Sequence, residues 1–311
     1  MRAERNVHER VVEAPADVVG ALLDRLSSPD DPISPSPVWP PIRFDRPLGV
    51  GADGGHGFVR YRVTAYEPGR VIRFDFPPPH SGHHTLTVEP LDADRCRVTH
   101  VLEERQGLRE ALIWSLAIRP MHDVMIEELL DNVVRAATPE APLRPAHWSR
   151  WTRLMRRAVW YRPKAVAFPA AAALARRAFD EPDFTDSWQL PLDPGMPKAP
   201  AAWRDVLPFE VRASAPDELL LGEDASHLDF RASVLIADDT VTLTTVVRIH
   251  NLRGRLYWAV VRRFHPFVTR LALRRTHRRL AYAAPPAPVR LTRDARAGAA
   301  GDADAAATAR T

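Results

Sequence analysis

The chain has 311 residues, 45% of them hydrophobic, which is enough for two domains with real cores and excludes a globally disordered protein. Cys96 is the only cysteine, so a disulfide framework within the chain is excluded. The net charge of +4 conceals an asymmetry. Residues 1–137 carry 16 Arg and 21 Asp or Glu, whereas the remainder carries 27 Lys or Arg and 18 Asp or Glu.

The N-terminal residues lack the apolar run of a secretory signal. The longest apolar run, over 165–175, is shorter than a membrane-spanning helix and contains Pro169. Together with the lone cysteine, these features predict a cytoplasmic protein.

The first half predicts a strand over 7–14 and a helix that begins after Pro15. Several antiparallel strands, separated by Gly- and Pro-rich turns, follow between 42 and 106. Apolar residues at helical spacing then predict a long helix over 108–137, with a kink at Pro120. This order is typical of an α+β fold in which a curved antiparallel sheet wraps around one long helix.

The second half predicts the same order of elements. Residues 148–178 are expected to be helical, broken near Pro163 and Pro169. Strands over 227–236 and 241–251 form an antiparallel pair, and a long Arg-rich helix over 253–280 ends the domain. Asn251 stands where it can cap that helix.

Some residues of the first half resemble a known superfamily. The segments VVEAPADVV, GGHGFVRYRV, YEPGRVIRFDF, HHTLTVEP and RPMHDVMIEELLD are similar to START-like (SRPBCC) proteins, which include polyketide cyclases and dehydrases. In the second half, DELLLGEDASHLDFRASVLI and VTLTTVVRIHNLRGRLYWAVVRRFHPFV resemble the domain of unknown function family 2867, which is related to the same fold.

The resemblance implies two tandem helix-grip domains, each with a cavity under its long helix for an apolar or amphipathic molecule. We expect a START-like domain over 1–140, a basic helical connector over 141–180, a second START-like domain over 181–283 and a disordered tail over 284–311. No reaction follows, because this superfamily contains enzymes, lipid carriers and simple binding proteins.

Three histidines of the first half are candidate catalytic residues. In a helix-grip fold, His84 and His100 on strands and His122 on the long helix can face the cavity and act as acid and base, with Glu103 or Glu13 as the companion carboxylate. The simpler interpretation, which we favour, is surface histidines and one or two hydrogen-bonded core histidines. No metal site is expected, because no metal-binding motif is present and the histidines belong to different elements.

Candidate ligand-binding residues occur in both halves. Arg60 and Arg62 alternate on one strand and could clamp a carboxylate. The alternative is a solvated sheet edge, with cross-strand partners at Glu67 or Asp75, and this is the favoured interpretation. Asp229, Arg231 and His250 carry the second resemblance, and they either line a pocket mouth or serve the joint between strand and helix.

The leading hypothesis is a two-domain binder of a hydrophobic small molecule of lipid or polyketide type, without a cofactor. The first alternative is a cyclase- or dehydratase-type enzyme. The second is a protein that uses its Arg-rich helices for peripheral contact with an anionic membrane. A basic face that docks on the acidic first half explains the arginines without a further partner. No nucleic-acid motif is present, so a nucleic-acid partner is not expected.

Overall fold

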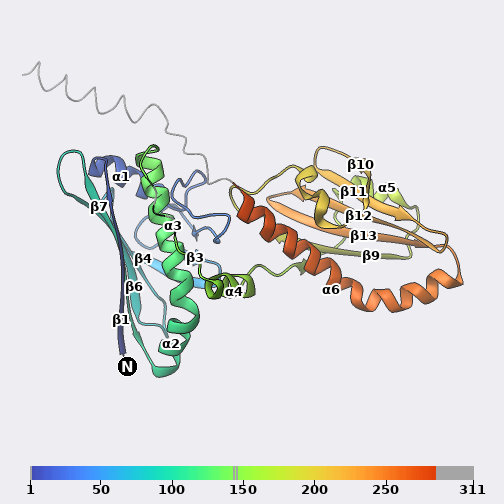
Figure 1. The fold of residues 1–311 in the computed structure, drawn as a ribbon, viewed down its shortest axis with the longest axis horizontal. Coiled ribbons are helices and arrows are strands. Elements are labelled where there is room, and N and C mark those ends of the chain that lie inside the picture. The colour runs from blue at the N-terminus through green and yellow to red at the C-terminus, as the bar shows by residue number, and fades with distance from the viewer. Residues whose placement is uncertain (1, 143, 145, 285–311) are drawn as a thin grey trace, which may run out of the picture. The chain divides into compact units, whose positions relative to one another are not determined.

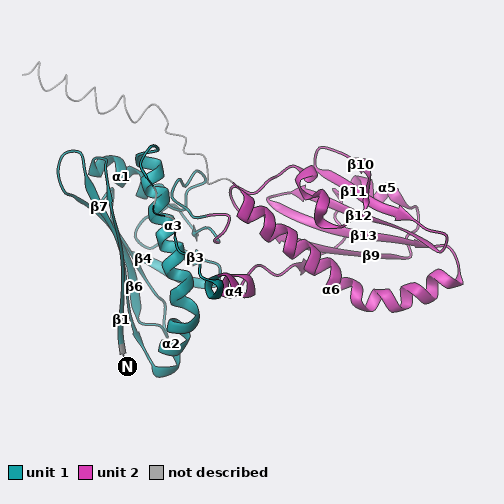
Figure 2. Ribbon diagram, in the orientation of Figure 1, with its two compact units in different colours: residues 1–35, 40–152, 286–311 teal, residues 36–39, 153–285 magenta. Residues whose placement is uncertain are grey.

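The computed structural model describes residues 2–142, 144 and 146–284. The described residues divide into two compact units (Figure 2): unit 1 contains those up to 35 and between 40 and 152, and unit 2 contains those over 36–39 and 153–284. The tail predicted over 284–311 lies, apart from Ala284, outside the described residues.

Unit 1 contains one antiparallel sheet whose strands follow the order β1-β7-β6-β5-β4-β3-β2. Its strands are β1 (Arg2–Val12), β2 (Arg43–Phe44), β3 (Asp53–His56), β4 (Val59–Glu67), β5 (Val71–Asp75), β6 (Gly82–Pro90) and β7 (Cys96–Gln106). Because β1 pairs with β7, the first and last strands of the unit are neighbours, and sequence-adjacent strands fill the rest of the sheet.

The helical part of unit 1 closes one face of this sheet (Figure 1). Its elements are α1 (Ala16–Leu23), α2 (Leu108–Ile113), the π-helical turn η1 (Trp114–Ile118) and α3 (Arg119–Ala137). The single long helix expected over 108–137 is therefore interrupted by η1, and Pro120 follows η1 at the start of α3. The carbonyl of Leu116, four residues before Pro120, accepts the indole N–H of Trp151 instead. Leu130 and Val133 of α3 are fully buried against the sheet in the main core.

Helix α1 meets the β4–β5 turn at very close range. A Cβ atom built at Gly20 would lie 2.3 Å from the carbonyl oxygen of Gly69, whose own φ of +71° suits glycine. Asp24 fixes the same contact, since its Oδ1 accepts the backbone N–H of Gly69 at 2.8 Å and the hydroxyl of Tyr66 at 3.0 Å. The backbones of the two elements touch because no side chain stands between them.

Replacing Gly20 by alanine tests this contact. In an isolated helix, alanine is more favourable than glycine by about 1 kcal/mol. We nevertheless expect Gly20→Ala to lower the free energy of unfolding by about 1–3 kcal/mol, because the methyl group overlaps the Gly69 backbone. Urea unfolding measures the change. Val18→Ala, on the exposed side of α1, should change it by less than about 0.5 kcal/mol. A Gly20→Ala protein of unchanged or higher stability would contradict the close contact.

Unit 2 contains a second antiparallel sheet, in the order β10-β11-β12-β13-β9-β8. Its strands are β8 (Lys164–Ala165), β9 (Phe184–Pro191), β10 (Glu210–Ser214), β11 (Glu218–Asp224), β12 (Leu228–Ala237) and β13 (Thr240–Ile249). Its helices are α5 (Ala173–Ala178), the 3-10 helix η2 (Pro200–Val206) and α6 (Leu252–Ala283), together with α4 (Arg150–Ala158) from Arg153 on. The expected strand pair is β12 and β13.

The helical segment expected over 148–178 is broken near Pro163 and Pro169 as expected, but the break contains a strand that was not predicted. After α4, the chain forms the short strand β8, which pairs with β9 at the sheet edge, and helix returns only with α5. Pro163 and Pro169 bracket this non-helical segment, because proline disfavours helix in the residue before it and lacks an N–H.

The joint that leads into α6 is as predicted at Asn251. Its side-chain oxygen accepts the N–H of Gly254 at 3.1 Å, while its Nδ2 donates to the carbonyl of Ser226 at 2.9 Å. A Cβ at Gly254 would lie 2.0 Å from the carbonyl oxygen of His227, so the Leu-Arg-Gly joint needs glycine at this position. Helix α6 contains Pro266 and is bent (Figure 1). Within the described residues, none of the helices is both long and apolar enough to traverse a bilayer.

Candidate functional site

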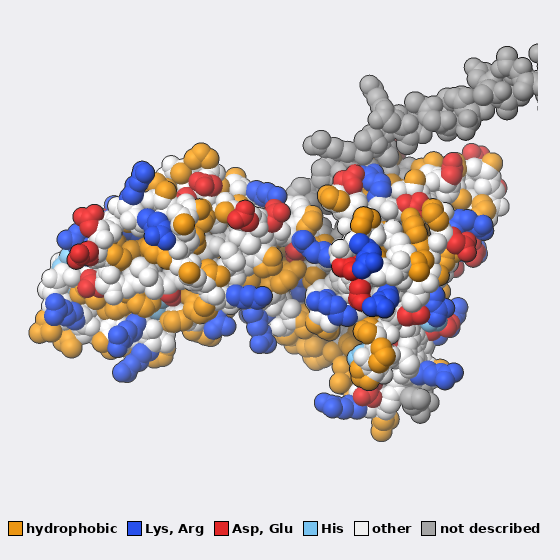
Figure 3. All heavy atoms as spheres, turned by 180° about the vertical axis from the view of Figure 1, so that it is seen from behind, with side chains coloured by type: hydrophobic (Ala, Val, Ile, Leu, Met, Phe, Trp, Pro, Cys, Tyr) orange, Lys and Arg blue, Asp and Glu red, His pale blue; other side chains and the backbone are white. Residues whose placement is uncertain are grey.

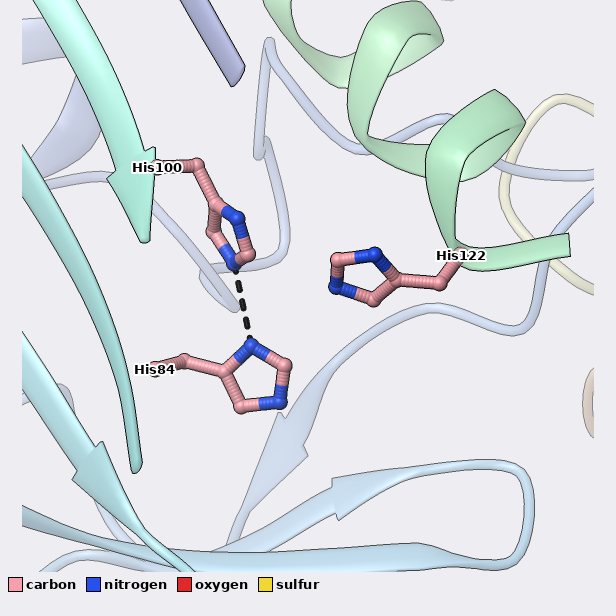
Figure 4. A group of neighbouring side chains, drawn as sticks. All are labelled: His84, His100 and His122. Carbon is pink, nitrogen blue, oxygen red and sulfur yellow. Dashed lines mark hydrogen bonds between the residues drawn. The ribbon is translucent and has the colours of Figure 1, made fainter. Parts of the chain in front are cut away.

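Three histidines from three elements converge inside unit 1 (Figure 4). Leu86 of β6 pairs with His100 of β7, so His84, two residues before Leu86, lies diagonal to His100 on the same face of the sheet. His122 reaches them from α3. Nδ1 of His84 and Nε2 of His100 share a hydrogen bond of 3.0 Å. One ring nitrogen from each of the three residues lies within 4.8 Å of the others.

The three rings are buried and poorly satisfied by hydrogen bonds. His84, His100 and His122 are 8%, 6% and 7% exposed. Within the described part of the chain, Nδ1 of His100 and both ring nitrogens of His122 have no hydrogen-bond partner, and neither has the indole N–H of the adjacent Trp114. Buried polar atoms without a partner cost free energy, so their concentration at one point marks this cluster for a ligand.

Burial keeps the three imidazoles neutral. Loss of hydration lowers the pKa of His84 and of His100 well below the usual 6.5, and repulsion between neighbouring histidines lowers each further. The pKa of His122 is also lowered, first by burial. All three rings therefore carry a lone pair at neutral pH, which is the form that binds a metal ion or accepts a proton.

A polar ladder between β1 and α3 lies beside the cluster, and the sequence analysis missed it. Asn6 donates to Oδ1 of Asp123 at 2.9 Å, and His8 contacts both Oδ1 of Asp123 at 3.2 Å and Oε1 of Glu127 at 2.6 Å. Arg10 continues the series to Glu127 and, at 3.3 Å, to Asp131.

Two spacings in the sequence could have predicted this ladder. Asn6, His8 and Arg10 alternate along one face of a strand, while Asp123, Glu127 and Asp131 repeat every four residues along one face of a helix.

The ladder favours the charged form of His8, whereas burial favours the neutral form of the three cluster histidines. Burial alone would lower the pKa of His8, but its hydrogen bonds to Asp123 and Glu127 outweigh that effect and raise the pKa above 6.5. The His8 and His122 ring centroids are 6.0 Å apart, so a positive charge on His8 further opposes protonation of His122. Asp123 lies 3.9 Å from Nδ1 of His122, beyond hydrogen-bond distance.

A cavity of about 50 Å³ adjoins the cluster, and His84 and His100 line it. Most of the remaining lining is apolar, with Tyr61, Phe74 and Leu86 from the sheet and Met125, Ile126 and Leu129 from α3. This volume accommodates a few water molecules, whereas pockets for drug-sized ligands measure about 300–1,000 Å³.

The structure does not bring Glu103 or Glu13 to the histidines. Glu103 is three residues from His100 on β7, so it faces the other side of the sheet, where it pairs with Arg5 at 3.1 Å. Glu13 is exposed just after β1. The carboxylate next to His122 on α3 is Asp123, which the sequence analysis did not select.

Arg60 and Arg62 also lie away from the cavity. They alternate on β4 with the buried Tyr61 and Val63, so both guanidinium groups point to solvent. Arg62 pairs with Asp53 of β3 at 2.7 Å, and Arg60 donates to the carbonyl of Val59 at 3.1 Å. The arrangement is the solvated sheet surface favoured in the sequence analysis, although the cross-strand partner is Asp53 rather than Glu67 or Asp75.

The candidate ligand-binding residues of unit 2 form ion pairs near the joint that leads into α6. His250 and Asp229 lie 3.0 Å apart, and Arg231 pairs with Asp224 at 2.6 Å while covering the ring of Phe179. Asp229 also accepts the backbone N–H of Ala225 at 3.2 Å. These contacts tie the start of β12 to the end of β11 and to the residue that follows β13.

Comparison with known proteins identifies one family. Residues 146–272 match the model of a family described as a protein of unknown function (DUF2867), which confirms that resemblance for the second half of the chain. The match includes much of the segment expected to be a connector as well as β9 to β13. No curated protein matches the chain.

Several solved structures resemble part of the chain. A solution structure from Thermobifida fusca is 20% identical and covers 46% of this chain and 97% of its own, with a TM-score of 0.34. A norcoclaurine synthase mutant from Thalictrum flavum, in complex with a transition-state analogue, is 14% identical and covers 44% and 96%, with a TM-score of 0.35. CalU16 from Micromonospora echinospora is 12% identical and covers 50% and 84%, with a TM-score of 0.33.

The neutral cluster predicts acid sensitivity. In the unfolded chain, the three histidines take up protons below about pH 6.5, whereas their lowered pKa values prevent this in the folded chain. Stability should therefore fall as the pH drops below 6.5, by up to about 1.4 kcal/mol per pH unit for each histidine. His8 does not offset this fall, because its raised pKa gives stability that is fully present below 6.5 and is lost only as the pH rises through the folded-state value.

Urea unfolding at a series of pH values measures the slope. His122→Gln should reduce the slope, and His80→Gln, at an exposed histidine, should leave it unchanged. An unfolding free energy that does not change with acidification would show that these histidines are protonated in the fold.

Proposed function

We propose that unit 1 binds a divalent transition-metal ion through His84, His100 and His122. The observation that carries this proposal is the meeting of three neutral imidazoles at a point where several of their nitrogen atoms lack partners. Imidazole nitrogen suits zinc, copper, iron and nickel ions, and three histidines with one open position are typical of catalytic zinc sites. The sequence analysis expected no metal, because no metal-binding motif is present and the histidines belong to different elements, and the present proposal departs from that expectation.

The distances favour a small ion. Zinc–nitrogen bonds of about 2.0–2.1 Å in a tetrahedral site place two imidazole nitrogens about 3.4 Å apart. Nδ1 of His84 and Nε2 of His100 are now 3.0 Å apart. An ion would fit between them if the two nitrogens moved apart by a few tenths of an ångström, the rings turned to aim both lone pairs at one point, and the donor ring shifted its proton to its other nitrogen. His122 would then supply the third nitrogen.

The adjoining cavity provides the fourth position. Its volume of about 50 Å³ admits water or a group of similar size beside the ion. A lipid- or polyketide-sized ligand, which the sequence analysis expected, needs several times that volume. We therefore propose that any organic ligand presents a small hydroxyl or carbonyl group to the metal. The same geometry favours metal-bound water over a carboxylate-assisted cyclase or dehydratase, because no carboxylate belongs to the three-histidine cluster.

We further propose that the two units are tandem helix-grip domains. Support comes from each unit by itself: unit 1 has a seven-stranded antiparallel sheet followed by α3, and unit 2 has a six-stranded antiparallel sheet followed by α6. A crystal structure that shows each helix seated in the concave face of its own sheet would establish this, and a flat or uncovered sheet would refute it.

Metal binding is tested on the full chain without an affinity tag of histidines. Cobalt(II) titration should give one equivalent of binding and the visible absorption of a tetrahedral site. Zinc present at 100 times its dissociation constant should raise the free energy of unfolding by about 2.7 kcal/mol.

Two substitutions make the metal experiment specific. His84→Gln and His122→Gln should each weaken binding by at least about 100-fold, since each removes a ligand rather than an outer partner. His83→Gln is the matched control, because His83 is next to His84 on β6 but faces the other side of the sheet. Circular dichroism checks that the variants fold. Absence of cobalt absorption, or equal affinity in all four proteins, would contradict the proposal.

A further inference from the structure

Helix α6 exposes a row of large apolar side chains, which we call the α6 apolar stripe. Each of its residues is between 48% and 69% exposed. Its members are Leu252, Leu256, Tyr257, Val260, Phe264, Phe267, Val268 and Leu271. Isolated exposed apolar residues are ordinary, but eight on 20 consecutive residues of one helix form a contiguous patch, and such patches mark interaction sites.

The stripe lies on the side of α6 opposite its own core. At 3.6 residues per turn, the stripe occupies about half of the helix circumference, and the buried residues Gly254, Trp258 and Thr269 lie on the other half. Trp258 packs on Phe184 of β9, with ring centroids 4.9 Å apart. The inner face of α6 is therefore satisfied by unit 2, and the stripe contributes nothing to that core.

Exposed arginines occupy the same turns as the stripe. At 3.6 residues per turn, Arg263 and Arg270 lie near one edge of it, Arg253 lies within it, and Arg255 and Arg262 lie on the other half of the helix. Arg253, Arg255, Arg262, Arg263 and Arg270 are all exposed, and α6 contains no Asp or Glu. Among the described residues, no ion pair involves the first four, and Arg270 covers the ring of Trp188. Figure 3 shows hydrophobic and basic side chains side by side along the lower left edge of the molecule, where unit 2 lies in that view.

We propose that residues 252–271 of α6 bind the surface of an anionic lipid bilayer, with the helix in the plane of the interface. The stripe enters the boundary between headgroups and acyl chains, and the arginines extend to the lipid phosphates. Helices with one wide apolar face and a basic polar face bind membranes in this way. The segment is about 30 Å long, and all of it presents the same face.

The positive charge of α6 favours an anionic lipid surface, rather than a second copy of the chain, as the partner of the stripe. Two copies that joined their stripes would bring unpaired arginines of like sign together, with no acidic residue on either helix to offset them. Anionic headgroups supply the missing negative charge over the whole length of the segment. This inference is independent of the metal site, which belongs to unit 1.

Vesicle flotation of the full chain tests the proposal, with vesicles of phosphatidylcholine alone and vesicles that also contain phosphatidylserine. Two variants separate the contributions. Leu256→Ser/Phe264→Ser/Phe267→Ser removes the centre of the stripe, and Arg255→Gln/Arg262→Gln/Arg263→Gln removes unpaired charge. The matched control is Arg177→Gln/Arg204→Gln, at two exposed arginines of unit 2 outside α6.

We expect the wild-type chain to float with phosphatidylserine vesicles and to bind phosphatidylcholine vesicles at least about tenfold more weakly. The α6 arginine variant should lose more than about tenfold in affinity for the anionic vesicles, and the stripe variant should lose a comparable factor. The control should bind as the wild-type chain does. All substituted side chains are exposed, so circular dichroism spectra should be unchanged.

Three results would overturn the proposal. Equal binding to both kinds of vesicle would show that the arginines do not contribute to binding. No binding to anionic vesicles, together with a dimer that the stripe variant dissociates, would assign the stripe to a second copy. Amide hydrogen exchange over 252–271 that is unchanged on addition of phosphatidylserine vesicles would show that this segment stays away from the bilayer.

Discussion

The contact between β1 and α3 determines what unit 1 can do. One face of β1 carries an amide, an imidazole and a guanidinium at alternate positions, and one face of α3 carries three carboxylates at every fourth position. Because each group of one series meets a group of the other, the helix has one register along the sheet. A slide of one turn would leave a partly buried carboxylate without a donor. That register is what places His122 over His84 and His100.

The same contact shifts the pKa values of neighbouring histidines in opposite directions. His8 gains two carboxylates and its pKa rises, whereas burial lowers the pKa values of the three cluster histidines and, at His122, outweighs the nearby Asp123. Burying neutral histidines whose ring nitrogens lack partners lowers the free energy of unfolding. A ligand that binds those nitrogens would restore it. A metal ion would restore it most completely, because it uses the lone pairs that burial has kept free.

Strand and helix patterns were enough to predict much of the fold. The β12–β13 pair and the Asn251 cap follow from local alternation and from a short polar side chain before a helix. The alternation of side chains along a strand would also have excluded Glu103 from the candidate site. Glu103 is three residues from His100, so it lies on the opposite face of β7. The metal cluster needed more than local pattern, because its three residues meet only through strand register and helix placement. The cavity volume depends on side-chain packing across several elements, which no single segment encodes.

X-ray anomalous diffraction at the zinc absorption edge, from crystals soaked in zinc, tests the central claim most directly. The account predicts one anomalous peak about 2.0–2.1 Å from a ring nitrogen of each of His84, His100 and His122. His8, His122 and Asp123 also lie close enough together to hold an ion, and they form the alternative metal site. A peak bound by that second group, or no peak at either place, would contradict the assignment.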